Sequence, residues 1–373
     1  MLTIIRNICM AFTDKHLKSL VSVAIQNGAS DIHIRSDEPP CLRIRGDLVP
    51  VKSNKNIDEN DIKNICTEVF QDKEVLEDYD NLKDYDSAFE IEGLCRLRFN
   101  FFRYSGTTGL ILRIINMTVP TIDELNLSPA LKEIVKKKRG LVLVTGATGS
   151  GKSTTLAAMI DYINEKQTKH IVTIEDPIEY LHSQKNSRIS QREVGRDTET
   201  FMSGLKSALR QDPDVILLGE LRDQTSISTA LKAAETGHLV MATVHTTDAI
   251  ATIGRILSMF PPEELKDVRK RLADSLFATI SQRMIKGKNK KKALIAQEIM
   301  VTSPGVKECI RGDEPVERII AMIEGGGTNE IGVKCQSFDQ HIFEFYQKGL
   351  ISKDEAEKAV RSQSNFLQKL IIE

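Results

Sequence analysis

The stretch GLVLVTGATGSGKST, residues 140–154, runs from an apolar segment into a glycine-rich loop that ends in lysine, serine and threonine. Residues 146–153 fit the pattern GxxxxGK[ST], which predicts a phosphate-binding loop when it follows a strand and opens a helix. The apolar residues 141–145 and the helix-forming residues from Thr155 onward supply that context. The stretch therefore predicts an α/β domain that binds a nucleoside triphosphate.

The loop residues have different expected roles. Glycines let backbone N–H groups wrap around phosphates, and the helix that follows directs its positive end toward them. We expect Lys152 to reach the β and γ phosphates and the Ser153 hydroxyl to ligate Mg2+. The predicted nucleotide contacts in the loop are Thr148, Gly149, Ser150, Gly151, Lys152, Ser153 and Thr154.

Three more apolar runs follow the loop, at residues 171–174, 215–218 and 239–244, with helical stretches between them. Nearly continuous apolar runs of this length are typical of strands in a parallel sheet that helices cover on both faces. Each run ends in polar or charged residues. Ligand sites in such sheets lie at the carboxyl ends of the strands, so we expect these endings to converge on the glycine-rich loop.

The acidic residues at these strand ends are candidate catalytic groups. Glu220 follows a Walker B-like strand, where a carboxylate can orient or deprotonate the attacking water. Glu175, Asp176 and Glu179 place three carboxylates within five residues. Their mutual repulsion favours a nearby cation, and we expect Glu179 to share a Mg2+ site with Ser153. The alternatives are a solvated turn and a surface glutamate.

Two histidines flank the run at 239–244. His245, at its carboxyl end, is placed to donate a hydrogen bond to a γ-phosphate, and we count it as catalytic. A structural histidine is the alternative. His238, just before the run, is included among the expected cofactor contacts together with Glu175 and Asp176.

Arginines recur in the first third of the chain, at Arg96, Arg98, Arg103 and Arg113. Guanidinium groups stabilise the charge that develops during phosphoryl transfer, and another subunit sometimes supplies them. The alternative is solvated charge on exposed strands.

The chain divides into regions of different pattern. Residues 12–27 are helical in period, short alternating segments follow at 31–35, 41–45 and 48–51, and a hairpin is expected over 95–115. We predict a small α+β domain over residues 1–117, a linker over 118–130 with two prolines, the ATPase core over 131–300 and a helical region over 301–373.

Composition narrows the function classes. The net charge of -1 argues against nucleic acid as a partner, and the basic run at 286–292 is interpreted as a solvated loop. No run reaches the roughly 18 apolar residues of a membrane-spanning helix, and residues 1–11 lack the features of a signal peptide. The six cysteines form no CxxC pair. We therefore expect a cytoplasmic protein with reduced cysteines.

Four motifs together resemble the secretion ATPase superfamily: Walker A at 146–154, an Asp box at 171–180, Walker B at 209–223 and a His box at 236–246. Residues 28–33 and the prolines at 39–40 resemble the amino domain of type IV pilus retraction ATPases, the PilT/PilU-like family. The resemblance implies a PAS-like amino domain, a RecA-like P-loop domain and a homohexamer that binds ATP and Mg2+. It also implies that Arg98 and Arg113 contact phosphates and that Glu220 is catalytic. The implied partner is an inner-membrane pilus platform protein, and the implied location of the enzyme is peripheral to that membrane.

The biological role has alternatives. Extension and type II secretion ATPases usually carry an extra amino-terminal domain and a tetracysteine element, and their absence from this sequence favours retraction. Retraction enzymes carry an AIRNLIRE-like segment, of which residues 305–312 keep only fragments. The chain is thus interpreted as a retraction motor, with the alternative of an accessory PilU-like motor or a nucleotide-binding regulatory subunit that acts with a paralogous pilus ATPase.

Overall fold

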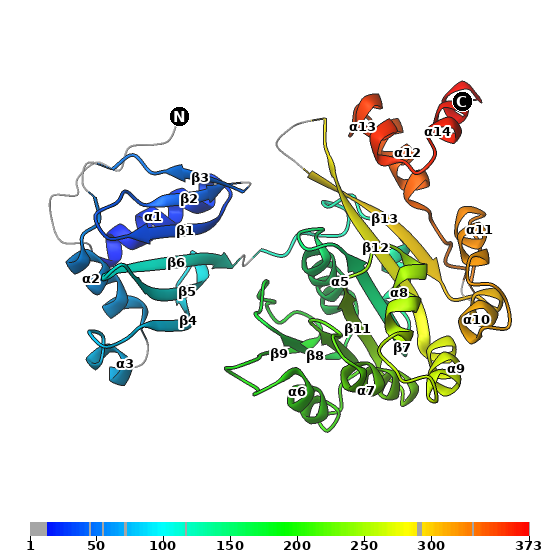
Figure 1. The fold of residues 1–373 in the computed structure, drawn as a ribbon, viewed down its shortest axis with the longest axis horizontal. Helices are drawn as coiled ribbons and strands as arrows, with labels where there is room; N and C mark the ends of the chain where they lie inside the picture. Colours follow the sequence, from blue (N-terminus) through cyan, green and yellow to red (C-terminus); the bar gives the residue numbers. More distant parts are fainter. Residues whose placement is uncertain are drawn as a thin grey trace. The chain divides into compact units, whose positions relative to one another are not determined.

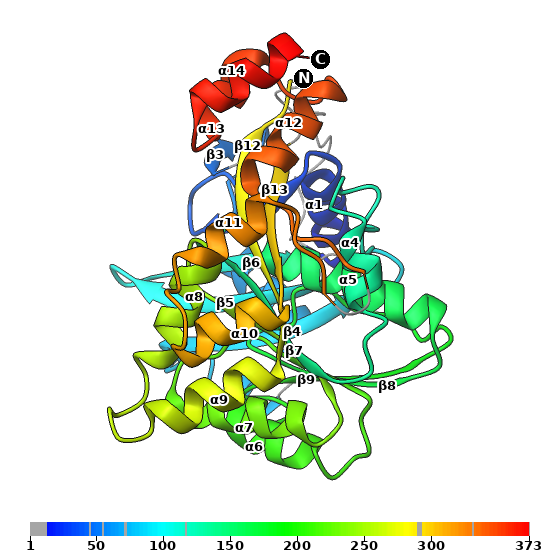
Figure 2. The same cartoon turned by 90° about the vertical axis from the view of Figure 1, so that its right-hand side faces the viewer.

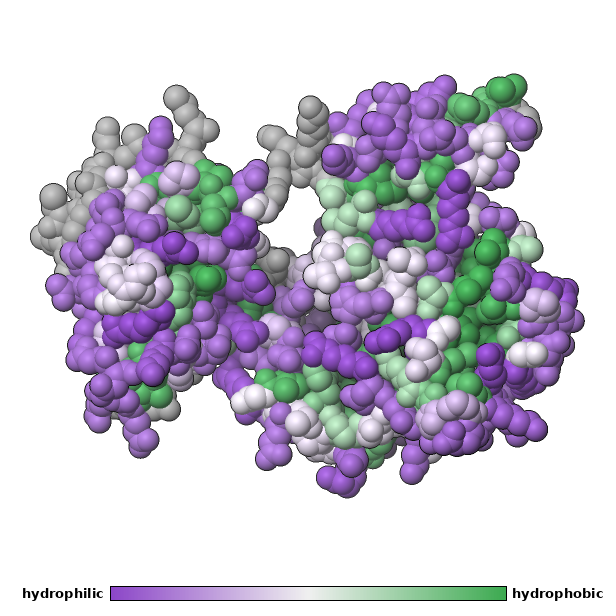
Figure 3. Space-filling model, in the orientation of Figure 1, coloured by the Kyte–Doolittle hydropathy of each residue, from purple (hydrophilic) through white to green (hydrophobic). Residues whose placement is uncertain are grey.

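A computed structural model describes residues 13–44, 46–53, 56–70, 73–115, 118–288, 293–329 and 332–372. The chain forms two compact units, Met1–Thr118 and Val119–Glu373, each with its own sheet and its own apolar core. In Figure 1, which is coloured along the sequence, the first unit runs from blue to cyan and the second from cyan to red. Hydrophilic residues cover most of the visible face of each unit, with apolar residues scattered among them (Figure 3).

The first unit contains a six-stranded sheet in the order β3-β2-β1-β6-β5-β4, in which every neighbouring pair is antiparallel. Its elements are α1 (Asp14–Gln26), β1 (Ala29–Arg35), β2 (Cys41–Ile44), β3 (Asp47–Pro50), α2 (Glu59–Val69), α3 (Lys73–Glu77), β4 (Asp84–Ile91), β5 (Cys95–Tyr104) and β6 (Thr107–Ile115). Alternate residues of β5 are buried against α1 and α2, as a half-covered sheet requires.

Sequence patterns predicted most, but not all, of this unit. The hairpin predicted over 95–115 is present, with a tight turn at Ser105 and Gly106, both at positive φ. Strand β4 was missed because its acidic residues obscure the alternation of its buried side chains. Phe12 and Arg45, at the ends of two predicted elements, lie outside the described residues.

The second unit is built on a seven-stranded sheet in the order β13-β12-β7-β11-β10-β8-β9. All its neighbouring strands are parallel except β12 and β13. The elements of this core are α4 (Ala130–Ile134), β7 (Gly140–Gly146), α5 (Lys152–Lys166), β8 (His170–Glu175), β9 (Arg188–Glu193), α6 (Phe201–Ala208), β10 (Val215–Leu218), α7 (Gln224–Glu235), β11 (Leu239–Val244), α8 (Ala249–Leu257), α9 (Leu265–Ser275), β12 (Leu276–Lys286) and β13 (Ala293–Val301).

The four apolar runs predicted as parallel strands are β7, β8, β10 and β11, and the prediction is confirmed. Every residue of β7, β10 and β11 is buried, because helices cover both faces of the sheet. The polar edge strand β9 and the β12–β13 hairpin were not predicted. Ile122 and Leu127, from the stretch predicted as a linker, belong to the second unit and pack into its core.

The last part of the chain is helical, as expected from its pattern. It comprises α10 (Pro304–Arg311), α11 (Arg318–Glu324), α12 (Phe338–Gln347), α13 (Lys353–Ala359) and α14 (Gln363–Ile372). Helices α12–α14 lie at the end of the β12–β13 hairpin in both views (Figures 1 and 2). A small apolar cluster joins them to that hairpin through Ile285, Leu294 and Phe338. Within the described ranges, no helix is long and apolar enough to cross a membrane.

Gly146 ends β7 at a place where no larger residue fits. Its φ is 149°, and a Cβ there would lie 2.8 Å from the carbonyl oxygen of Gln282 on β12 and would also meet the Ser150 side chain. Ser150 belongs to the phosphate-binding loop, and Gln282 belongs to the neighbouring strand β12. The glycine therefore permits β7, β12 and the loop to approach one another.

We expect Gly146→Ala to lower the free energy of unfolding by about 1–3 kcal/mol, since the added methyl group overpacks a buried site. Gly254→Ala is the matched control, because Gly254 is exposed on α8 and a Cβ there meets nothing within 4 Å. That change should raise stability by up to about 1 kcal/mol. Thermal unfolding of both variants measures the difference, and equal melting temperatures would contradict the assignment.

Candidate nucleotide-binding site

A cavity of about 430 Å³ lies at the carboxyl edge of the parallel strands. The residues proposed from sequence that line it are Thr148, Gly149, Gly151, Lys152, Ser153, Thr154, Glu175, Asp176, Glu179, Glu220 and His245. They come from the ends of β7, β8, β10 and β11, which are neighbours and run in the same direction. Parallel pairing thus brings together residues that are up to 97 positions apart, from Thr148 to His245.

The loop before α5 has the backbone geometry of a phosphate cradle. Gly149 and Gly151 have φ values of 78° and 86°, in the left-handed region that glycine adopts without strain. Helix α5 begins at Lys152, so its first unpaired N–H groups and its positive end face the cavity. This arrangement suits a phosphate group.

Lys152 is the central cation of the cavity. Its side chain is buried, with 8% exposed, and its Nζ donates hydrogen bonds of 3.0 Å to the carbonyl oxygens of Gly146 and Ala147. Burial lowers the pKa of Lys152, while Glu220 and Glu179 act in the opposite direction. A cation in such partly desolvated surroundings attracts phosphate more strongly than one in water.

The carboxylates of the Asp box differ in environment. Glu175 accepts hydrogen bonds from Thr173 Oγ1 at 2.6 Å and Gln191 Nε2 at 3.2 Å, and burial raises its pKa. Asp176 and Glu179 are exposed at the cavity wall. Among the residues that the structure describes, no three acidic, histidine or cysteine side chains form a metal cluster. The oxygen atoms of Ser153 and Glu179 fit the usual mode of Mg2+ binding, in which one or two protein ligands act together with phosphate oxygens.

Glu220 is held from two sides. Arg222 Nε donates to Glu220 Oε2 at 2.7 Å, and His245 Nε2 lies 3.5 Å from Glu220 Oε1. The ion pair with Glu220 raises the pKa of Arg222. The glutamate side chain is 20% exposed, so it is positioned yet accessible to a water molecule in the cavity. This geometry suits a group that orients a nucleophile.

Several lining residues were not proposed from sequence. Arg222 could have been proposed from its position two residues after Glu220. Its hydrogen bond to Glu220, however, is known only from the structure. Tyr180 is within hydrogen-bonding distance of Thr154, with 3.1 Å between Oη and Oγ1. The side chain of His182 is 3% exposed, and burial lowers its pKa to about 4. Phe201 and Met284 add apolar wall. The apolar and aromatic residues gave no signal in the sequence beyond ordinary core composition.

The structure does not bring Ser150 or His238 to the cavity wall. Ser150 is buried below the loop, with 5% exposed. The carbonyl of His238 accepts a hydrogen bond from the N–H of Gly140, the first residue of β7, and its ring nitrogen Nδ1 lies 2.9 Å from the Ala233 carbonyl. His238 therefore sits at the amino edge of the sheet, and the expectation of a cofactor contact in this cavity is corrected. The His box spans a whole strand, so its two histidines lie at opposite edges.

The arginines of the first unit fall into two classes. Arg98 and Arg113 pair directly across β5 and β6, and Arg113 Nε forms a 2.9 Å ion pair with Asp31. Arg113 is 61% exposed. Like charges opposite each other in a sheet are unfavourable, so a sequence selected for stability alone would avoid this pair.

Arg103 is different from these two. It donates to Glu59 at 3.1 Å, to Thr108 at 2.8 Å and to the Tyr79 carbonyl at 3.0 Å. These bonds join α2, the segment after α3 and β6, so Arg103 has a structural role.

We expect Lys152→Ala to weaken ATP binding by about 10- to 100-fold, the usual effect of losing a hydrogen bond to a charged group. Lys166→Ala is the matched control at the other end of α5, where Lys166 forms an exposed ion pair with Glu165. Titration with a fluorescent ATP analogue measures both affinities. Equal affinities would mean that the cavity does not bind the triphosphate.

Comparison with known proteins places the chain in a family. The type II/IV secretion system protein family matches residues 10–324. The chain is 41% identical over 350 residues to the type IV pilus retraction ATPase PilT of Pseudomonas aeruginosa, which covers 94% of this chain and 99% of PilT. It is 34% identical over 339 residues to the type IV pilus ATPase PilU of the same organism, covering 91% of this chain and 87% of PilU.

Solved structures agree with the sequence comparison. The crystal structure of the pilus retraction motor PilT with bound ADP superposes with a TM-score of 0.83 and 36% identity, covering 94% of this chain and 99% of that one. The Legionella pneumophila ATPase DotB superposes with a TM-score of 0.80 and 26% identity, covering 96% and 98%. The predicted α/β class, with a small domain ahead of a P-loop ATPase domain, is confirmed, as is the resemblance to retraction ATPases. The chain belongs to the type II/IV secretion system protein family.

Proposed function

We propose that this chain is a Mg2+-dependent ATPase that works as a homohexamer and drives type IV pilus retraction. The observation that carries the proposal is the meeting of Lys152, Ser153 and Glu220 in one cavity. The chain around that cavity matches the retraction ATPase PilT over nearly the full length of both proteins.

The residues of the cavity have different roles in ATP hydrolysis. The loop N–H groups and Lys152 hold the phosphates, and Glu220 orients the attacking water, with Arg222 and His245 keeping its carboxylate in place. A bound Mg2+ would be held by Ser153 and Glu179 and would neutralise phosphate charge. Phosphoryl transfer depends mainly on such positioning and charge stabilisation, and these groups are the part of that machinery that one subunit supplies.

The same proposal assigns the parts of the chain. Residues 1–117 form the PAS-like domain, 118–130 the linker, 131–300 the RecA-like core and 301–373 the helical region. Arg98 and Arg113 contact the phosphates of a neighbouring subunit, which explains two guanidinium groups on adjacent strands. The enzyme acts at the cytoplasmic side of the inner membrane on the pilus platform protein, with no nucleic acid partner.

An accessory role is the second candidate. Residues 305–312, which cover α10 from its second residue to its C-cap, depart from the AIRNLIRE pattern of retraction enzymes, and the chain is also similar to PilU. In that role the chain assists a paralogous pilus ATPase. A regulatory subunit without turnover is disfavoured by the intact Lys152 and Glu220.

Subunit mixing tests the arginine assignment. Arg98→Ala and Glu220→Gln should each abolish ATP hydrolysis, because the first removes charge stabilisation and the second removes the carboxylate that orients water. If Arg98 acts on a neighbour's nucleotide, co-assembled hexamers of the two variants regain about a quarter of the wild-type phosphate release. In a random one-to-one mixture, half of the sites keep Glu220, and about half of those face a subunit that keeps Arg98.

The matched control is a mixture of Glu220→Gln with Lys152→Ala subunits. Lys152 and Glu220 line the cavity of one chain, so every site in this mixture is damaged and hydrolysis stays absent. Recovery in the control, or none in the arginine mixture, would refute action on a neighbouring subunit.

Deletion of the gene tests the biological role. Loss of a retraction motor should leave cells with excess surface pili and no twitching, counted by electron microscopy and a motility assay. Normal pilus numbers with weakened motility would indicate the accessory role. Cells without pili would contradict both candidates, because they would mean that the chain drives extension.

A further inference from the structure

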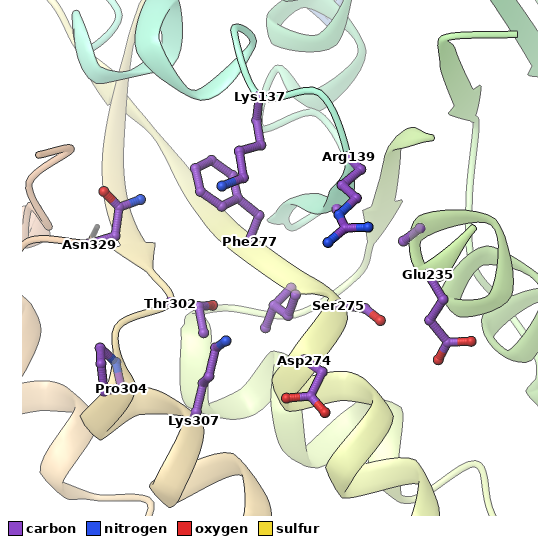
Figure 4. A pocket seen from close by; sticks show the side chains of 13 residues that line it. Lys137, Arg139, Glu235, Asp274, Ser275, Phe277, Thr302, Pro304, Lys307 and Asn329 are labelled. Atoms are coloured by element: carbon purple, nitrogen blue, oxygen red, sulfur yellow. The ribbon is translucent and has the colours of Figure 1, made fainter. Parts of the chain in front are cut away.

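A second cavity, of about 350 Å³, opens at the amino edge of the same sheet (Figure 4). Its walls come from Lys137 and Arg139 just before β7, from Gly140 at its start, from the end of α7, from the α9–β12 junction and from the start of α10. Gly140 and Gly146 are the two ends of β7, and six residues of strand correspond to about 20 Å. The cavity is therefore separate from the nucleotide-binding cavity.

Three cations line the cavity, and none of them has an ion-pair partner among the residues that the structure describes. Within the described ranges, Lys137, Arg139 and Lys307 form no ion pair, and Lys137 Nζ lies 5.0 Å from the centre of the Phe277 ring. Figure 4 shows Lys137 and Lys307 on opposite walls, with their ammonium groups turned toward the space between them. Half-buried ammonium groups arranged in this way attract an anion.

Two carboxylates also line the cavity, but both are neutralised by arginines. Asp274 Oδ1 lies 2.7 Å from Arg311 Nη2, and Glu235 Oε1 lies 2.8 Å from Arg271 Nε. The three cations in the lining thus keep their positive charge uncompensated.

Buried hydroxyl groups complete the lining. Ser275 and Thr302 are 6% and 9% exposed, and in the described part of the chain neither Oγ atom has a hydrogen-bond partner. A buried hydroxyl without a partner is unfavourable, and such groups are rare unless a ligand or water satisfies them. Both Oγ atoms are themselves inaccessible to solvent, so each side chain must rotate before its hydroxyl donates to an anion held by the lysines.

We propose that this cavity is a binding site for a soluble, phosphate-bearing small molecule. Lysine, arginine and hydroxyl donors are the groups that proteins use for phosphate oxygens, and three uncompensated cations suit a ligand with at least two ionised phosphate oxygens. The volume falls within the range of small-molecule sites. The site does not depend on the proposed retraction function, because no residue of the nucleotide-binding cavity contributes to it.

Calorimetric titration of the full chain with inorganic pyrophosphate tests the site. Binding should persist in Lys152→Ala, which removes the cation of the nucleotide-binding cavity, and should weaken about tenfold or more in Lys137→Ala and Lys307→Ala. Lys138→Ala is the matched control, since Lys138 belongs to the same basic run but does not line the cavity. Absence of binding, loss in Lys152→Ala alone, or equal weakening in the control would overturn the proposal.

Thr302→Val separates a role of this hydroxyl in ligand binding from a role in stability. It removes an unpartnered buried hydroxyl, so the melting temperature without ligand should stay equal or rise, while the increase caused by pyrophosphate should shrink. A fall in the melting temperature without pyrophosphate, together with an unchanged pyrophosphate effect, would refute the role of the hydroxyl.

Co-sedimentation with phosphatidylglycerol vesicles separates a soluble ligand from a membrane. We expect no binding that depends on Lys137 and Lys307. Vesicle binding that requires these lysines, without pyrophosphate binding, would replace the proposed small molecule with a lipid surface.

Discussion

The parallel pairing of β7 with β11 and β12 is the constraint on which both cavities depend. It aligns Gly146 beside Gln282, where only a hydrogen atom fits on the Cα, and this close approach sets the path of the phosphate-binding loop. The same pairing continues through β10 and β8, so the residues after each strand meet at one edge. Because strands have two ends, the sheet also creates an opposite edge, where the basic cavity lies.

The charged residues at the two edges of the sheet are arranged differently. In the nucleotide-binding cavity, Glu220 is held between Arg222 and His245. Such pairing positions groups that must act in a fixed geometry. At the amino edge, arginines outside the lining neutralise its two carboxylates, and Lys137 and Lys307 form no ion pair with any residue that the structure describes. The first arrangement suits catalysis, and the second suits capture of an anion.

Sequence patterns predicted the strands and glycines of the nucleotide-binding cavity well, because each is a local feature of the chain. They were less reliable for residues whose position depends on partners far away. His238 is close to His245 in the sequence but is separated from it by the full length of β11. Arg103 resembles Arg98 and Arg113 in the sequence, yet its bonds to Glu59 and Thr108 join α2 to β6 within its unit.

The sequence by itself determined the phosphate-binding loop, the parallel strand pattern and the acidic residues at the strand ends, since spacing and hydrophobic period act within short segments. Tertiary structure decided how Glu220 is clamped, which arginines are structural, and that Lys137 and Lys307 face each other across a cavity. The residues brought together in this way are up to 170 positions apart in the chain, from Lys137 to Lys307. The order and register of strands bring such residues together, and no local pattern encodes that order.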